Sequence, residues 1–168
     1  MSARSVSLPM AVAVVLAVAV VAMLVGPARG GTPEPAGRPT LSGAELSAVL
    51  APALDCPDDL GVVVDAQEPA PRTLDDPALL VAARCDAGAG NPPSGVFLVR
   101  AGDAGAQLAA TLVPDTLDLV LPHLAVTDDA VTVTADGFSA PDVPRCCPDR
   151  TVVRTWAVGD GTLEPVGA

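Results

Sequence analysis

The residues best able to do covalent chemistry are the four cysteines, Cys56, Cys85, Cys146 and Cys147. The last two are adjacent and lie between Pro144 and Pro148, far downstream of the others. Cysteines can form disulfides, exchange electrons or hold a metal, but a zinc site needs four ligands at compact spacing. This chain has no Cys-x-x-Cys motif and a single histidine. Structural disulfides are therefore favoured over a redox-active adjacent pair, and no metal ligand is assigned.

Four cysteines allow three pairings. A bond between Cys146 and Cys147 closes a strained eight-membered ring, and neighbouring side chains in extended backbone point to opposite faces. We therefore expect one of them to bond to Cys56 and the other to Cys85. Each bond would close a loop of roughly 60 to 90 residues and stabilise the fold by about 4 kcal/mol in the chain-entropy model.

Catalysis by a Ser-His or Cys-His pair would have to use His123, the only histidine. It follows Pro122 at the start of an expected strand, and no Gly-x-Ser-x-Gly motif accompanies it. The sequence therefore predicts no catalytic residue, no cofactor and no enzymatic activity. A hydrolase or hydrolase-associated module is the rival hypothesis, and it requires His123 in a buried cleft beside a carboxylate and a serine.

Three pairs of adjacent acids raise the question of a glycosidase or a calcium site, namely Asp58-Asp59, Asp75-Asp76 and Asp128-Asp129. Adjacent acids in strands or turns point apart, and aspartate favours turns for backbone reasons. A calcium loop needs oxygen ligands at alternate positions together with a glycine, which the segment around Asp75 lacks. A calcium-dependent adhesion module is thus a third hypothesis, without assigned ligands.

Arg154 and Trp156 share one face of an expected strand. A guanidinium stacked on the indole ring could form a ligand pocket. The favoured interpretation is that the arginine stem covers the sheet while its charge pairs with a surface acid.

Charge excludes two classes of partner. After residue 30, seven arginines and no lysine stand against 20 acidic residues, a formal charge of −13. Such a surface repels the phosphates of nucleic acid and of anionic lipid. The expected partner is a protein or cell-wall ligand of unknown identity, with the domain itself a monomer.

Aromatic residues make up only 2% of the chain, so we expect a thin core of Val, Leu and Ala. Disulfide bonds would add to the stability of a fold with such a core.

The first 30 residues indicate export. An apolar run from Leu8 to Val25 follows Arg4 and precedes small residues suited to cleavage at 28–30. The run is long enough to be a signal peptide or an uncleaved signal-anchor helix. Residues 31–40 are predicted to be a Pro/Gly-rich linker. We expect residues 41–168 to form an extracytoplasmic domain, either anchored to the membrane through the N-terminal helix alone or secreted after cleavage.

Local patterns predict one helix followed by strands. Ser42 and Glu45 have the spacing of a capping box at the start of a helix over 43–54. Beyond residue 61, short β-rich runs alternate with turn sequences, and the segments 123–135 and 151–166 are typical of hairpins. We expect an α+β fold, in which this N-terminal helix packs on one antiparallel β-sheet of six or seven strands with two disulfides.

The C-terminal region also resembles a known family. Cys146-Cys147-Pro148, the strand Thr151 to Trp156 and the turn Gly159-Asp-Gly161 are similar to the C-terminal signature of LppP/LprE-type exported proteins of mycobacteria and their relatives. The similarity covers roughly residues 43–165. It implies a small disulfide-bonded domain in the cell envelope and carries over no catalytic residue. This chain departs from the lipoproteins of the family, because no cysteine lies directly after its apolar run. The expected function is a non-enzymatic binding or structural module.

Overall fold

The computed structural model describes residues 41–74, 77–88, 91–102 and 105–167, which belong to one compact unit spanning residues 38–168. The expected export segment (1–30) and linker (31–40) lie outside the described residues, as do Asp75 and Asp76. In the ranges that are described, no helix is both long and apolar enough to cross a membrane.

The capping box predicted for the helix is confirmed. Helix α2 (Gly43–Ala53) begins after Ser42, whose Oγ accepts a hydrogen bond from the Glu45 N–H at 3.3 Å. The Glu45 carboxylate in turn accepts from the Ser42 N–H at 2.8 Å and from its hydroxyl at 2.6 Å. These bonds hold the pKa of Glu45 below its ordinary value, because they stabilise the charged carboxylate.

The helix ends in a turn with one residue in the left-handed conformation, and this turn places Cys56 beside the sheet. Asp55 has φ +50°, and the Cys56 N–H donates to the carbonyl of Ala51 at 3.0 Å. The Asp55 N–H donates to the carbonyl of Pro52 at 3.4 Å. This is the Schellman pattern, which satisfies the last carbonyls of a helix and turns the chain sharply.

Replacing Ser42 by alanine is expected to lower the free energy of unfolding by about 1 kcal/mol, because the hydroxyl that accepts from the Glu45 N–H and donates to the Glu45 carboxylate is lost. The Ser47→Ala change inside the same helix is the matched control and should be neutral or slightly stabilising. Urea unfolding followed by circular dichroism measures both. Equal effects of the two changes would show that the cap does not stabilise the domain.

The described residues form eight strands in two antiparallel sheets of four, in the orders β1-β2-β3-β4 and β5-β6-β7-β8. The prediction of a single sheet of six or seven strands under a helix is therefore wrong, and the domain is mostly β. The strands of the first sheet are β1 (Val62–Pro69), β2 (Ala78–Cys85), β3 (Ser94–Gly102) and β4 (Gly105–Val113). Those of the second sheet are β5 (Val120–Val126), β6 (Ala130–Gly137), β7 (Arg150–Gly159) and β8 (Thr162–Val166). The two predicted hairpins, β5–β6 and β7–β8, are confirmed.

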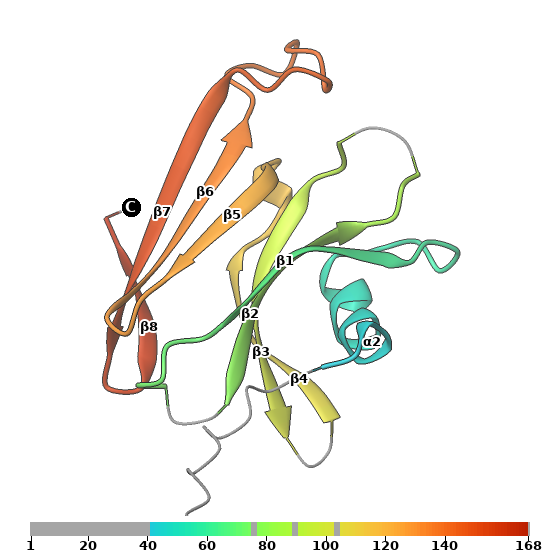
Figure 1. The fold of residues 1–168 in the computed structure, drawn as a ribbon. Coiled ribbons are helices and arrows are strands. Elements are labelled where there is room, and N and C mark those ends of the chain that lie inside the picture. The colour runs from blue at the N-terminus through green and yellow to red at the C-terminus, as the bar shows by residue number, and fades with distance from the viewer. Residues whose placement is uncertain (1–40, 75–76, 89–90, 103–104, 168) are drawn as a thin grey trace, which may run out of the picture. The chain divides into compact units, whose positions relative to one another are not determined.

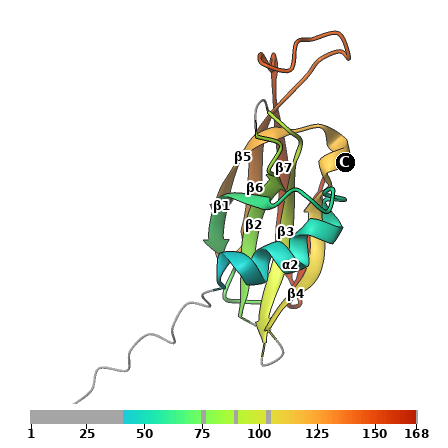
Figure 2. The same ribbon diagram turned by 90° about the vertical axis from the view of Figure 1, so that its right-hand side faces the viewer.

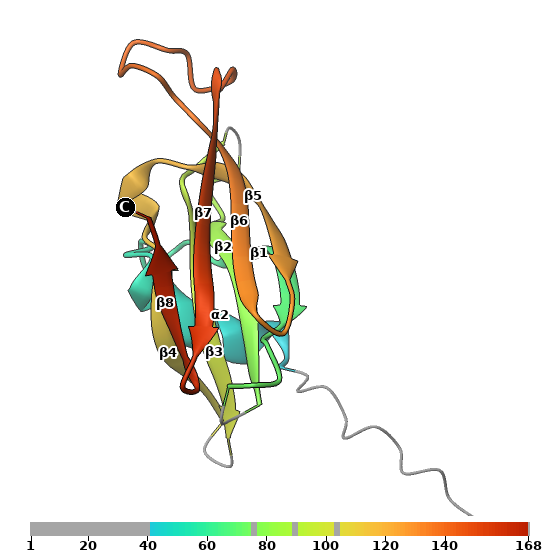
Figure 3. The ribbon, with the colours of Figure 1, turned by 90° about the vertical axis from the view of Figure 1, so that its left-hand side faces the viewer.

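The domain has three layers, which Figure 1 shows side by side: the second sheet, the first sheet and α2. The helix crosses one face of the first sheet (Figure 2), and the second sheet covers the other (Figure 3). Burial follows from this arrangement, because β2 and β3 are the middle strands of the middle layer and are buried on both faces over six residues each.

Side chains of the middle sheet point alternately to its two faces and so contribute to two separate cores. One core lies under the helix and comprises Leu46, Leu50, Leu54, Leu79, Val81, Ala83, Phe97 and Val99. The other lies between the sheets, where Leu80, Ala82, Val96 and Leu98 meet Leu124, Val131, Val133, Ala135 and Trp156. Of the three aromatic residues, Phe97 lies in the core under the helix and Trp156 in the core between the sheets, whereas Phe138 belongs to neither core.

The chain changes sheets through a short irregular connection. It consists of the 3₁₀ turn η1 (Asp115–Leu117) and Asp118, whose backbone is left-handed with φ +56°. Leu121 also has positive φ, at a bulge in the pairing of β5 with β6. The Leu119 carbonyl accepts a hydrogen bond from the Ser94 N–H at 2.8 Å, which ties this connection to the start of β3.

Candidate functional site

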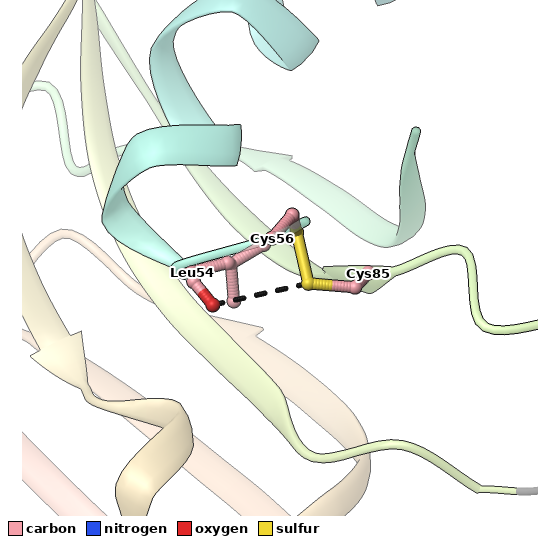
Figure 4. Close-up of a disulfide and its surroundings, with 3 residues drawn as sticks. All are labelled: Leu54, Cys56 and Cys85. Carbon is pink, nitrogen blue, oxygen red and sulfur yellow. Dashed lines mark hydrogen bonds between the residues drawn. A yellow bond between two sulfur atoms is a disulfide. The ribbon is translucent and has the colours of Figure 1, made fainter. Parts of the chain in front are cut away.

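The cysteines pair differently from the prediction. Cys56 bonds to Cys85, with their Cα atoms 5.6 Å apart, and not to either member of the adjacent pair. The bond joins the segment after α2 to the end of β2, as Figure 4 shows. The Sγ of Cys85 also lies 3.8 Å from the Leu54 carbonyl oxygen. This is a packing contact, since a disulfide sulfur carries no proton to donate. The bond therefore links the helix layer covalently to the first sheet.

Cys146 and Cys147 bond to each other. The prediction rested on extended backbone, in which their side chains would diverge. Instead, the Cys147 N–H donates to the Pro144 carbonyl at 2.9 Å, so Arg145 and Cys146 form the corner of a turn. Both cysteines are exposed, and both lie in the connection between β6 and β7. The two disulfides therefore belong to different sheets, and neither ties the sheets together.

The connection that holds this pair, residues 138–149, is the candidate site and is called the 138–149 loop. It extends beyond the ends of β6 and β7 in all three views (Figures 1, 2 and 3). The neighbouring hairpin between β7 and β8 turns in two residues, Asp160 and Gly161. Long connections between adjacent strands are uncommon unless they serve a function, whereas short ones suffice to pair the strands.

The base of the loop is closed by Asp149 and Ser139. The Asp149 carboxylate accepts hydrogen bonds from the Ser139 N–H, at 2.8 Å, and from the Ser139 hydroxyl. The Asp149 N–H donates to the Gly137 carbonyl at 3.1 Å, which extends the β6–β7 ladder into the loop. The bonds from Ser139 lower the pKa of Asp149 below its ordinary value, because they favour the charged form.

Arg145 anchors the tip of the loop to distant parts of the chain. Its guanidinium forms an ion pair with Asp118 and donates to the Asn91 carbonyl at 3.1 Å. It also lies over the ring of Phe138, 4.6 Å from the ring centre. One side chain thus fixes the loop to the sheet-switching connection and to the segment before β3. Although the side chain is about half exposed, it makes three kinds of contact at once.

The residues considered for catalysis and calcium binding are exposed wherever the structure describes them. His123 is exposed on β5, opposite Thr134 of β6, and does not lie in the buried cleft that the hydrolase hypothesis requires. The acids at 58–59 and 128–129 are exposed. Among the described residues, no group of three or more His, Cys, Asp or Glu could hold a metal ion. The exposure of His123 therefore differs from what the hydrolase hypothesis requires.

Arg154 and Trp156 do not form the pocket considered for them. Trp156 is buried between the sheets, whereas Arg154, two residues earlier on β7, is exposed. The arginine–ring contact found in the described part of the chain is that of Arg145 with Phe138. The contacts of Arg145 with Asp118 and Asn91 were not predicted from the sequence, because these residues lie 27 and 54 positions from Arg145.

Replacing Arg145 by alanine should free the tip of the 138–149 loop without unfolding the domain. We expect amide exchange at Cys147 to rise by about tenfold, while the global stability changes by less than about 1 kcal/mol, as is usual for exposed ion pairs. Arg154→Ala is the matched control, since it removes an exposed arginine of the neighbouring strand. Unchanged exchange at Cys147 would show that Arg145 does not hold the loop.

Acidification should open the base of the loop. Because the pKa of Asp149 is lower folded than unfolded, the stabilisation is present above the unfolded pKa and is lost as pH falls through the folded value. Amide exchange at Ser139, corrected for its intrinsic pH dependence, should therefore become faster in acid. The Asp149→Ala variant, which lacks the acceptor oxygens, should show fast exchange already at neutral pH. Equal protection of Ser139 in both proteins at neutral pH would contradict this role.

Comparisons of the chain with family models, with curated proteins and with solved structures found no match.

Proposed function

We propose that this chain is an exported cell-envelope protein whose domain is a non-enzymatic binding module, and that the 138–149 loop is its binding surface. The observation that carries the proposal is the anchoring of an exposed loop by Arg145 to two distant segments. A loop fixed before it meets a partner loses less conformational entropy on binding. A strand connection with no role beyond pairing β6 with β7 needs neither this length nor this anchor.

Two further features support export. The Cys56–Cys85 disulfide joins the helix to the sheet, and structural disulfides persist mainly in oxidising compartments. The resemblance of the Cys-Cys-Pro segment to LppP/LprE-type exported proteins agrees with this location. In the proposal, the membrane is reached only through the N-terminal segment, and the partner is a protein or cell-wall ligand, not nucleic acid.

The location is tested by the intact mass of the protein recovered separately from culture medium, membranes and cytoplasm, after alkylation of free thiols. We expect a chain with no alkylated cysteine in the medium or the membranes, and its mass will give the N-terminus. A full-length chain with four alkylated cysteines, found mainly in the cytoplasm, would refute export.

The binding surface is tested by photocrosslinking in intact cells. A photoreactive residue is placed at Asp142, which is exposed in the loop, or at Ala48, which is exposed on α2 and serves as the control. Crosslinked species specific to position 142, and weakened by Arg145→Ala, are the expected result. Their chemical class will distinguish a protein partner from a cell-wall polymer. Equal crosslinking from both positions would argue against the loop as the binding surface.

A further inference from the structure

We propose that the Cys146–Cys147 disulfide is a thiol–disulfide exchange site, which accepts two electrons from a dithiol. The proposal goes beyond the binding function and does not depend on it. It rests on a comparison of the two disulfides of the domain. They differ in their exposure, in the segments that they join and in the other contacts that hold those segments in place.

The first contrast is access. Both Cys146 and Cys147 are exposed, whereas Cys56 and Cys85 are half-buried beside the core under α2. Exchange requires a thiolate to approach a sulfur atom of the disulfide, so exposure governs its rate. An attacking thiol can reach the loop pair in the folded domain. The other bond needs the end of the helix to move first.

The second contrast is in what each bond holds. Cys56–Cys85 spans 29 residues and joins two layers. Cys146–Cys147 joins neighbours and constrains little beyond the one peptide unit between them. The loop around the adjacent pair is held independently, by Arg145 at its tip and by Asp149 at its base. Removing the Cys146–Cys147 bond should therefore leave the fold intact. The bond can then be reduced and re-formed while the domain stays folded.

The exchange follows ordinary disulfide chemistry. A thiolate of the dithiol attacks one sulfur of the pair, the Cys146–Cys147 bond breaks, and the displaced cysteine leaves as a thiolate that takes a proton from solvent. The second thiol of the reductant, after losing its proton, then attacks the mixed disulfide. The reductant leaves as a disulfide, having lost two electrons and two protons. The pair becomes two thiols, having gained the same number of each.

The first test uses a small dithiol, dithiothreitol, under native conditions. The oxidised protein is treated with graded concentrations, alkylated at intervals and mapped by mass spectrometry of its peptides. We expect Cys146 and Cys147 to be labelled faster than Cys56 and Cys85 by about tenfold or more. The fluorescence of Trp156 should not change during the fast phase, because the ring is buried in the core between the sheets. Equal rates, or unfolding that accompanies the fast phase, would overturn the proposal.

The second test distinguishes a protein dithiol from a small thiol. A Cys-x-x-Cys oxidoreductase whose resolving cysteine has been replaced is mixed with the oxidised protein, and mixed disulfides are counted by intact mass. The control is the double variant C146S/C147S, which keeps the Cys56–Cys85 bond. An adduct with the wild type alone supports a protein dithiol as the substrate. Reduction by dithiothreitol without an adduct assigns the site to small thiols, and an equal adduct with the control would overturn the proposal.

Discussion

Replacing Cys56 and Cys85 together by alanine is expected to lower the free energy of unfolding by about 3.5 kcal/mol. The chain-entropy model gives this value for a loop of about 30 residues, which corresponds to the separation of 29 between the two cysteines. A domain of this size has a total stability of about 5 to 15 kcal/mol, so the loss is a large fraction of it. The melting temperature should fall by roughly 10 to 15 °C.

The matched control for this prediction is the C146S/C147S variant. The same model assigns about 1 kcal/mol to a loop of two residues, before any cost of closing the small ring. We therefore expect this variant to lose no more than about 1 kcal/mol. Urea unfolding of the three proteins measures both effects. If removal of the adjacent pair cost as much as removal of Cys56–Cys85, the view that only the latter supports the fold would be wrong.

The elements of the fold were predictable because their signals are local. The capping box at Ser42 and the alternation of Val and Thr in β6 each depend on a few neighbouring residues. The pairing of strands into two sheets depends on contacts between distant segments. One relevant signal was present in the sequence, since Leu79–Ala83 and Val96–Val99 are continuous apolar runs without alternation. Such runs indicate strands covered on both faces, which requires a layer on each side of their sheet.

The candidate site was less predictable than the fold. The four cysteines were identified, but their pairing was wrong because the adjacent pair was assigned extended backbone and lies in a turn. The contact of Arg145 with Asp118 depends on where η1 lies relative to the 138–149 loop. No spacing rule relates residues so far apart in the chain. Contacts that fix a loop from outside it are therefore visible only in the structure.

The Phe97→Ala change is expected to lower the free energy of unfolding by about 3 to 5 kcal/mol, the range for loss of a fully buried ring. Phe97 is 0% exposed and lies in the core under α2. The domain has only two phenylalanines and one tryptophan, so the small aliphatic side chains around this ring cannot replace the buried area that is lost. Unfolding followed both by Trp156 fluorescence and by circular dichroism should give coincident transitions if the three layers unfold together.

Gly95 provides the partner for a double-mutant cycle with this ring. A Cβ atom added at Gly95 would lie 2.4 Å from the Cζ of Phe97 and 3.3 Å from a methyl group of Leu54. Gly95→Ala alone should therefore cost about 1 to 3 kcal/mol, because the ring must move within a packed core. In the Phe97→Ala background the same change should be close to neutral, since its methyl group enters the space that the ring has left. Strict additivity of the two changes would mean that the ring does not pack over Gly95, and the large loss predicted for Phe97→Ala would need another cause.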